Sequence, residues 1–476
     1  MIRKVLAIAV GCTLVGFGGF SSTGASATDL SEDRSVGEME SYLSMRPVQE
    51  PVALSDPTTF SHVQDLRKAY GLSTSAEFVH RLHSDPKAFG GMSSSAGLLG
   101  GIVISAEELP HAYLRAAAEW VGGKVDEFAY DSVPGYAGTS VWPDATVVLY
   151  CSSCIVRETE TEIRSTVQVD EPFTISVQSV AYSLADLQKF GESATETLLG
   201  LGVRSGGAVD VDTNSVTLHV PADSLELARK LLPAVVKVAG DFIEVAPDVN
   251  KNDALGYNLI EGGQYITSDP SPLRPNGTAL TSGFAVQSAY GPFILTAGHY
   301  TYPAVCAEPG YTWRQGGLAL GTMTAACGYG GAVDGALITT YGFRNNYGGV
   351  HWYSYDYVHR VTFGVTNHAL VNQTVCQTGA TTTGMTGDQQ IYNRCGIVSS
   401  LSSGSPCGNA SPAWTMSLGA ASYVRASGDS GAGVVWPTGY GFGAAGTHSC
   451  VGFSGTGAIF SRFSVMASQW GLTITP

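Results

Sequence analysis

Apolar side chains in the first half of the chain recur with a helical period in one segment and form a strand-like run in another. Between residues 107 and 121 they recur every three to four positions, which predicts an amphipathic helix. The glycine pair at 122–123 is expected to end it. An apolar run at 145–150 predicts a strand. Residues 28–100 have a mixed pattern of helix and loop, with a Gly/Ser-rich patch at 90–101.

The segment from 208 to 238 predicts a β-α-β unit. Strands are expected at 208–211, 215–220 and 234–238. Between the second and third strands, a helix is expected to begin at Asp223, a favourable N-cap residue, and to run to Leu232. Small α/β lobes are the simplest interpretation of this half of the chain.

Beyond residue 256 the pattern changes to short β-rich runs separated by Gly, Asn, Ser and Thr. Helical periodicity returns only at 463–470. Many short strands at close spacing predict a sandwich or a barrel, and glycine supplies the tight turns between them. The second half is therefore predicted to be all-β.

Charge divides the chain at the same place. Of the 40 acidic and 25 basic residues, 7 acidic residues and 7 arginines, with no lysine, lie beyond residue 256. This leaves 33 acidic and 18 basic residues in the first half, which carries the whole net charge of −15. Two regions of such different composition are expected to be two folding units. Neither has a basic patch, so nucleic acid is not expected as a partner.

The first 27 residues have the three parts of a secretory signal peptide. Arg3 and Lys4 precede an apolar run at 5–20, and Ala25-Ser26-Ala27 forms an A-x-A cleavage site. The apolar run is shorter than the roughly 18 residues that a membrane span needs, and no later segment matches one. The chain is therefore expected to be secreted, with no membrane partner.

Apart from Cys12, the chain has eight cysteines, an even number that predicts disulfides in an exported protein. Cys151-Ser152-Ser153-Cys154 spells C-x-x-C, which is typical of a redox or zinc half-site. No second cysteine pair lies near it in the sequence, so a local disulfide is the preferred interpretation. The other six lie in the second half, and their connectivity is open: Cys306, Cys327, Cys376, Cys395, Cys407 and Cys450.

The segment Gly428-Asp429-Ser430-Gly431-Ala432-Gly433 places a serine on a tight glycine turn. A serine hydroxyl becomes a nucleophile when it has a neighbouring base and amides directed at the developing oxyanion. The flanking glycines allow a sharp turn that presents the N–H groups of Gly428 and Ser430. On its own the pattern is more typical of an ordinary Gly/Ser turn, and it lacks the final glycine of an α/β-hydrolase elbow.

Two further segments place a histidine and a carboxylate beside apolar strands. An apolar run at 293–296 leads into Ala297-Gly298-His299, and Asp334 stands just before the apolar run 335–338. Alone, the histidine is typical of an ordinary strand end and the aspartate of a turn before glycine. The chain order His, Asp, Ser matches the catalytic residues of chymotrypsin and differs from the orders in subtilisin and α/β-hydrolases.

The segments 295–299 and 428–431 resemble the two signature blocks of chymotrypsin-like serine proteases. The lysine-free second half more closely resembles the bacterial streptogrisin and α-lytic protease branch. Residues 258–263 resemble the mature N-terminus of that branch, and the segments around Cys376 and Cys395 resemble its middle disulfide region.

This resemblance implies an all-β, chymotrypsin-like protease domain of two β-barrels at 257–476, preceded by an α/β (α+β) pro-region at 28–256. Ser430 would attack the scissile carbonyl, His299 would take its proton and Asp334 would orient His299. The amides of Gly428 and Ser430 would hold the oxyanion. The pro-region would assist folding and then inhibit the mature enzyme.

The family also suggests disulfides paired in sequence order. These would be Cys306–Cys327, Cys376–Cys395 and Cys407–Cys450. The chain departs from the family pattern at Tyr300, where members carry a cysteine directly after the catalytic histidine, and at Cys407, which lies unusually far before the serine.

Substrate preference in this fold is set by the pocket beside the nucleophile. A trypsin-like pocket has an acidic residue six positions before the serine, and Val424 at that position argues against cleavage after Lys or Arg. Ser427 and His448 resemble the pair with which glutamate-specific bacterial members hold a carboxylate, which favours an acidic P1 residue. The alternative is that His448 satisfies a buried hydrogen bond and the pocket takes a large apolar side chain. By the same resemblance, Ser449 is expected to hydrogen-bond to Asp334.

The sequence therefore predicts a secreted serine endopeptidase made as a pro-enzyme. Its expected partners are protein or peptide substrates and its own pro-region, and a monomer is expected. No cofactor and no metal are expected. Two alternatives from other classes remain, a catalytically inactive barrel that acts as a binding module and an exported esterase that uses the same serine.

Overall fold

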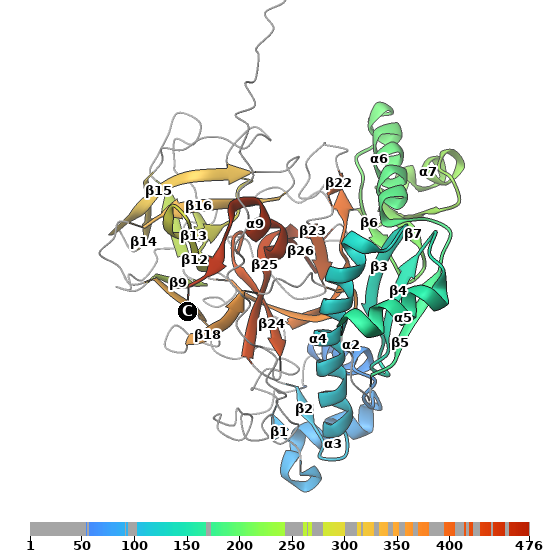
Figure 1. Ribbon diagram of the computed structural model, residues 1–476, viewed down its shortest axis with the longest axis horizontal. Coiled ribbons are helices and arrows are strands. Elements are labelled where there is room, and N and C mark those ends of the chain that lie inside the picture. Colours follow the sequence, from blue (N-terminus) through green and yellow to red (C-terminus); the bar gives the residue numbers. More distant parts are fainter. Residues whose placement is uncertain are drawn as a thin grey trace, which may run out of the picture. The chain divides into compact units, whose positions relative to one another are not determined.

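The structure is a computed structural model, shown in Figure 1. It describes residues 54, 57–90, 92–93, 102–167, 173–242, 260–263, 265–268, 279–299, 312–315, 318–327, 333–340, 346–351, 358–364, 370–379, 395–404, 414–415, 418–421, 429–438, 441–452 and 457–475. The predicted signal peptide, most of the Gly/Ser-rich patch and the predicted boundary at 256/257 lie outside these ranges. No helix in the described part of the chain has the length and apolar character that crossing a membrane requires.

Helices and a small hairpin open the described part of the chain. The elements are α2 (Pro57–Ala69), α3 (Ala76–Ser84), the 3-10 turn η1 (Pro86–Phe89), β1 (Met92–Ser93) and β2 (Val103–Ile104). The two strands pair antiparallel. The mixture of helix and loop expected in the first hundred residues is therefore observed where the structure describes them.

Helix α4 (Leu109–Ser132) is longer than the sequence predicts. It continues through Gly122-Gly123, so the prediction that this pair ends the helix is wrong. A Cβ at Gly122 would meet the side chains of Leu370 and Val141, and both glycines are buried. Each glycine costs the helix about 1 kcal/mol relative to alanine. Here the missing side chain allows close packing, which is why glycine occupies the middle of the helix.

Two lobes with the same order of elements make up most of the first half. In the first lobe α4 is followed by β3 (Tyr136–Val141), β4 (Val147–Cys151), α5 (Val156–Val167) and β5 (Ile175–Ser179). β3 and β4 are antiparallel, whereas β4 and β5 are parallel and are connected by α5. Helix α4 packs along β3 and β4 (Figure 1).

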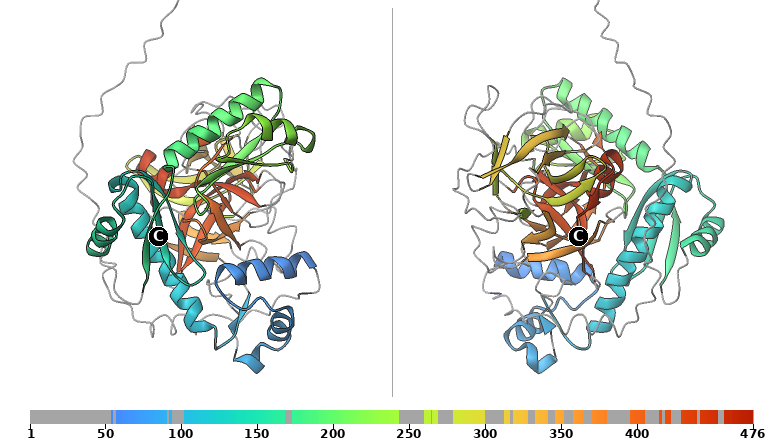
Figure 2. Two further views of the ribbon diagram at one scale, coloured as in Figure 1. Left: turned by 90° about the vertical axis from the view of Figure 1, so that its right-hand side faces the viewer. Right: turned by 60° about the vertical axis from the view of Figure 1, so that its left-hand side comes forward.

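The second lobe repeats this arrangement with α6 (Leu184–Gly200), β6 (Gly206–Asp210), β7 (Ser215–His219), α7 (Leu225–Leu231) and β8 (Val236–Ala239). β6 and β7 are antiparallel, β7 and β8 are parallel, and α6 lies against β6 and β7 (Figure 2). The predicted β-α-β unit is therefore confirmed. Asp223 is not the N-cap as expected, because it lies inside a 3-10 turn, η2 (Ala222–Ser224), that precedes α7.

The first barrel of the second half is built from antiparallel strands in the order β11-β10-β14-β15-β16-β13-β12-β27. Residues 282–283 lead directly from β11, at one edge of this order, into β12, the neighbour of β27 at the other edge, as in a sheet that curls into a barrel. The strands are β10 (Tyr265–Ser268), β11 (Ala279–Thr281), β12 (Phe284–Ser288), β13 (Gly291–Thr296), β14 (Thr312–Gln315), β15 (Leu318–Cys327), β16 (Gly335–Thr339) and β27 (Thr473–Ile474).

The second barrel closes through strand pairing alone. Its ring is β24-β19-β20-β23-β26-β25, and β25 pairs again with β24. The ring strands are β19 (Thr374–Thr378), β20 (Cys395–Ser400), β23 (Leu418–Ala421), β24 (Gly433–Thr438), β25 (Gly441–Val451) and β26 (Ala458–Arg462). Beyond β25 the sheet continues through β18 (Val358–Gly364), β17 (Asn346–His351) and β9 (Ile260–Gly262).

A single helix, α9 (Phe463–Trp470), appears in the described part of this half, with the bounds that the sequence predicts. It follows β26 directly, and Phe463 packs edge-to-face on Phe284 of the first barrel with ring centroids 5.9 Å apart. The expectation of an all-β domain with two barrels, preceded by an α/β region, is confirmed.

One sheet contains strands from both halves of the chain. β21 (Ser403–Gly404) pairs with β22 (Trp414–Thr415) and, antiparallel, with β6 of the second lobe. The result is a five-stranded sheet in the order β22-β21-β6-β7-β8. A lone edge strand exposes unpaired backbone groups, and this pairing covers the edge of β6.

Candidate functional site

His299 and Asp334 lie at facing ends of two paired strands. β13 ends at Thr296, three residues before His299, and β16 begins directly after Asp334. Thr296 pairs with Ala336 in the antiparallel ladder, so these two ends lie side by side. His299 Nδ1 is 2.8 Å from Asp334 Oδ2, and the side chains are 9% and 1% exposed.

The carboxylate of Asp334 is fixed from more than one direction. Its Oδ1 accepts a hydrogen bond of 2.9 Å from the Gly298 N–H. Its own backbone N–H donates to Ser461 Oγ on β26 of the second barrel at 3.0 Å. The expected bond from Ser449 is not formed, because Ser449 Oγ is buried without a hydrogen-bond partner among the described residues. A strand of the second barrel thus supports the aspartate, but through Ser461.

Ser430 lies in the turn that precedes β24. Its backbone carbonyl accepts a hydrogen bond of 2.8 Å from the Thr281 N–H, which belongs to the first barrel. Its side-chain hydroxyl donates to the Ser449 carbonyl at 3.3 Å. The next residue, Gly431, donates its N–H to the His448 carbonyl at 2.7 Å. The serine is therefore held between a strand end of the first barrel and β25 of the second.

Gly431 shows how closely the serine turn approaches the histidine turn. Its φ of +89° lies in the region that favours glycine. A Cβ there would overlap Thr296 Oγ1, the Thr281 carbonyl and the Ala297 N–H. Since Ala297 is two residues before His299, the turns that carry His299 and Ser430 are in direct backbone contact.

Asp429, directly before the serine, is fully buried. Its backbone carbonyl accepts a bond of 2.8 Å from the Ala432 N–H, which closes the turn around Ser430. Its carboxylate lies so close to Gly379 that any Cβ there would overlap it.

The residues expected around the substrate are described only in part. His448 is buried on β25 and pairs across the ladder with Phe460 on β26. Ser427 and Val424 lie outside the described residues, and so does Gly428 of the expected oxyanion hole. In the part of the chain that the structure describes, no three His, Cys, Asp or Glu side chains cluster as a metal site would require.

The structure describes the disulfide state of five of the eight cysteines. Cys376 and Cys395 form a disulfide between the facing strands β19 and β20, the pairing that the resemblance suggests. Cys151, the last residue of β4, and Cys154 are joined in a local disulfide, the interpretation preferred from the sequence. Cys450 is also disulfide-bonded. Cys306 and Cys407 lie outside the described residues, as does the side chain of Cys327.

Thr281 and Ser461 contribute to the site although no sequence pattern pointed to them. Each is a single hydroxyl residue on an ordinary strand, about 150 and 30 positions away from the serine along the chain. Only the pairing of strands within the two barrels brings them to the site, so a local motif search has no means of finding them.

Two β-barrels, with a His–Asp pair on one barrel and a serine turn held between both, define the chymotrypsin-like serine protease fold. No model of a known protein family matches the chain, and no curated protein matches its sequence.

Solved structures with similarity to the chain are bacterial proteases of this fold, the class that the sequence motifs resemble. One is a glutamic-acid-specific serine protease described as using a histidine triad in substrate binding, with 20% identity and a TM-score of 0.34; the match covers 45% of this chain and 100% of that one. Thermobifida fusca protease A has 20% identity, coverage of 46% and 100%, and a TM-score of 0.34. A Nocardiopsis protease has 22% identity, coverage of 46% and 99%, and a TM-score of 0.33.

Gly431→Ala is expected to destabilise the second half strongly. The substitution adds strain at positive φ, about 1–2 kcal/mol, and overpacking of about 1–3 kcal/mol against the histidine turn. Gly291→Ala is the matched control, because Gly291 also has positive φ but has open space around it. Urea unfolding of the purified chain measures both. An equal decrease in the free energy of unfolding in the two variants would contradict the close contact inferred between the two turns.

Proposed function

We propose that this chain is a secreted serine endopeptidase, made as a pro-enzyme, in which Ser430, His299 and Asp334 form the catalytic triad. The observation that supports this most directly is the 2.8 Å contact between His299 Nδ1 and the buried Asp334 carboxylate. The backbone contact between the His299 and Ser430 turns supports it further. A buried carboxylate facing one ring nitrogen leaves the other nitrogen to serve a neighbouring serine.

In the proposed reaction Asp334 accepts the Nδ1–H of His299 and so selects the tautomer with a lone pair on Nε2. Nε2 takes the proton of the Ser430 hydroxyl as Oγ attacks the scissile carbonyl carbon. The imidazolium that forms is stabilised by the Asp334 carboxylate, which stays ionised. The N–H groups of Gly428 and Ser430 donate to the oxyanion of the tetrahedral intermediate.

Collapse of this intermediate breaks the peptide C–N bond, and the His299 imidazolium gives its proton to the leaving amine. An acyl-enzyme remains on Ser430. Water then attacks the ester with His299 as general base, and the second intermediate releases the acid product and restores the serine. Bonds made and broken balance without a metal or an oxidant.

Secretion and pro-enzyme synthesis are supported by the sequence pattern of the first 27 residues and by the difference in charge between the two halves. Disulfides at Cys151–Cys154 and Cys376–Cys395 fit an oxidising compartment. The first-half lobe that contributes β6 to a sheet with β21 fits a pro-region that binds the protease domain.

For the substrate we propose a preference for glutamate at P1. His448 is buried on β25, and its carbonyl accepts the N–H of Gly431, the residue after the serine, at 2.7 Å. Together with Ser427 it would offer donors to a carboxylate without a buried lysine or arginine. A pocket for a large apolar side chain is the alternative.

Ser430→Ala should reduce kcat/KM on a casein-type protein by roughly 10⁶-fold, because the nucleophile is lost. Asp334→Asn should reduce it by roughly 10⁴-fold, because the amide favours the wrong tautomer of His299. Both are measured on the purified mature enzyme beside Gln287→Ala, an exposed position on β12. Wild-type inactivity on any peptide bond would sink the proposal, and ester turnover alone would favour an esterase.

The mature enzyme should cut a peptide mixture mainly after glutamate, identified by mass spectrometry with Ser430→Ala as the blank. In the His448→Gln variant the preference for glutamate over apolar P1 residues should fall at least tenfold, because an amide replaces the imidazole that donates to the substrate carboxylate. Cuts after Phe, Tyr or Leu in the wild type would instead assign His448 a structural role.

Residues 257–476 refolded alone should regain activity far more slowly than the full chain. An all-β fold rich in glycine orders a large chain entropy before its non-local contacts form, and a bound pro-region would template them. Recovery of proteolysis is followed over time after dilution from denaturant, with and without the first half added in trans. Equally fast recovery with and without the first half would show that the first half does not assist folding.

A further inference from the structure

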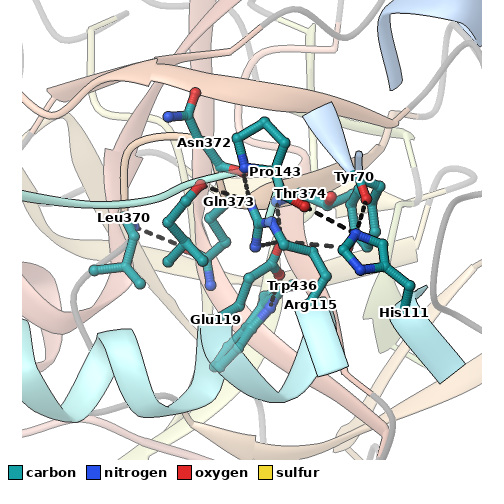
Figure 3. A network of polar contacts seen from close by, with 11 residues as sticks. Tyr70, His111, Arg115, Glu119, Pro143, Leu370, Asn372, Gln373, Thr374 and Trp436 are labelled. Atoms are coloured by element: carbon teal, nitrogen blue, oxygen red, sulfur yellow. Dashed lines mark hydrogen bonds and ion pairs between the residues drawn. The ribbon is translucent and has the colours of Figure 1, made fainter. Parts of the chain in front are cut away.

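An ion pair on helix α4 is completely buried against the second barrel (Figure 3). Arg115 and Glu119 lie one helical turn apart, and both side chains are 0% exposed. Arg115 Nη1 donates to Glu119 Oε1 at 3.0 Å. A fully buried ion pair is stable only when further hydrogen bonds replace the lost water. The partners of this pair therefore show what the helix recognises.

Glu119 binds two N–H donors of the second barrel with its two oxygens. Trp436 Nε1 on β24 donates to Oε2 at 2.9 Å, and the backbone N–H of Thr374, the first residue of β19, donates to Oε1 at 3.2 Å. The hydroxyl of Tyr70, in the turn after α2, donates to Oε1 at 3.2 Å. Burial raises the pKa of the Glu119 carboxyl, and Arg115 and these donors act against that rise.

Arg115 completes the arrangement with a carbonyl of the same barrel. Its Nη2 donates to the Asn372 carbonyl at 2.7 Å and to the Val141 carbonyl on β3 at 2.9 Å. The guanidinium also lies over the Tyr70 ring, 5.2 Å from its centroid. The barrel thus presents two N–H donors to the Glu119 carboxylate and one carbonyl acceptor to the Arg115 guanidinium, and it fits a helix that carries these two residues four positions apart.

Apolar contacts surround this polar centre and keep water out. Trp120 of α4 stacks on Trp436 with ring centroids 5.7 Å apart. One turn further, the absence of a side chain at Gly122 lets the helix approach Leu370. A central polar anchor enclosed by packed apolar contacts is the arrangement found at binding hot spots.

We propose that Trp436, Thr374 and Asn372 form a docking surface of the protease domain for a helix that carries Arg and Glu one turn apart. Its occupant is helix α4 of this chain, and the Arg115–Glu119 pair is the recognition determinant that holds the first half in place once the chain is cut between the two halves. This inference rests on the proposed pro-enzyme function, because only a pro-enzyme is cut there.

A helix with other side chains at these two positions would lose binding free energy on this surface. A helix with only one of the two charges would bury an uncompensated ion, and one with neither would leave an indole N–H, a backbone N–H and a carbonyl unpaired. The surface therefore discriminates against an apolar helix as well as against a singly charged one.

The test uses the full chain with Ser430→Ala, which cannot cut itself, and with a site for an added sequence-specific protease inserted within 243–259. After cleavage, the dissociation rate of the first half from the immobilised second half is measured by surface plasmon resonance. Glu119→Gln and Arg115→Met are expected to accelerate dissociation on the order of 100-fold, as for other buried charge pairs that lose one partner. Trp436→Phe, which removes the donor from the barrel side, is expected to accelerate it on the order of tenfold.

Two further variants decide between recognition and mere helix stability. Glu160→Gln removes the carboxylate of an exposed Arg164–Glu160 pair with the same spacing on α5 and should leave the rate unchanged. Arg115→Met combined with Glu119→Leu should also dissociate fast, since the barrel groups remain unpaired. Circular dichroism of each uncut variant verifies that the chain is folded, and Trp436→Phe tests the contact without altering α4.

Slow dissociation in Arg115→Met/Glu119→Leu, or in both Glu119→Gln and Trp436→Phe, would overturn the docking proposal. Because the readout is binding in an inactive background, it is independent of proteolysis. Fast dissociation of these variants beside an inactive wild type would uphold the docking surface and reject the endopeptidase. Slow dissociation of these variants beside a wild type that cleaves peptide bonds would reject the docking surface and uphold the endopeptidase.

Discussion

The buried carboxylate of Asp334 is the constraint on which the site depends. A carboxylate removed from water is stable only if donors replace its hydration. Gly298 and His299 supply these donors from a turn of the first barrel. Ser461 holds the backbone of the same aspartate from the second barrel. The aspartate therefore needs both barrels folded and in contact, and the orientation of His299 depends on that contact.

The serine turn depends on the same contact from the opposite side. Thr281 of the first barrel binds the Ser430 carbonyl, while Ser449 and His448 of the second barrel accept hydrogen bonds from the turn. Positive φ at Gly431 removes the side chain that would separate this turn from Ala297. Because histidine and serine come from different barrels, small relative shifts of the barrels would change their separation, and these backbone contacts limit such shifts.

Sequence could predict the parts of this site that are local and could not predict the parts that are assembled. His299, Asp334 and Ser430 each stand in a short pattern whose turn or strand end the chemistry itself requires. Ser461 and Thr281 have no such pattern, since strand pairing alone brings them to the site. Ser449 illustrates the same limit, because family likeness predicted a bond to Asp334 that its buried hydroxyl does not make.

The error at Gly122-Gly123 has a related cause. Glycine has two uses in a helix, to end it or to allow a neighbour to approach closely, and local sequence favours the first. Which use applies depends on Leu370, nearly 250 positions away in the sequence. Periodicity located the elements of the lobes well, to within a residue or two for β6 and β7, because the apolar faces of those elements are set within each lobe.

A buried ion pair is a poor choice for maximal stability, and under the proposed pro-enzyme function that weakness would suit an interface that is lost after cleavage. Apolar side chains of similar volume on both the helix and the barrel would often bind more strongly than a buried Arg–Glu pair with its polar partners. Such apolar side chains would also leave an exposed hydrophobic patch on the barrel after release. Trp436 Nε1, the Thr374 N–H and the Asn372 carbonyl would instead bind water once α4 has left. Under the proposed function, the polar centre would make binding selective while the first half is attached and would leave a hydrated surface once it is released. The surrounding contacts, such as Trp120 on Trp436 and β6 on β21, add to the binding that the ion pair determines.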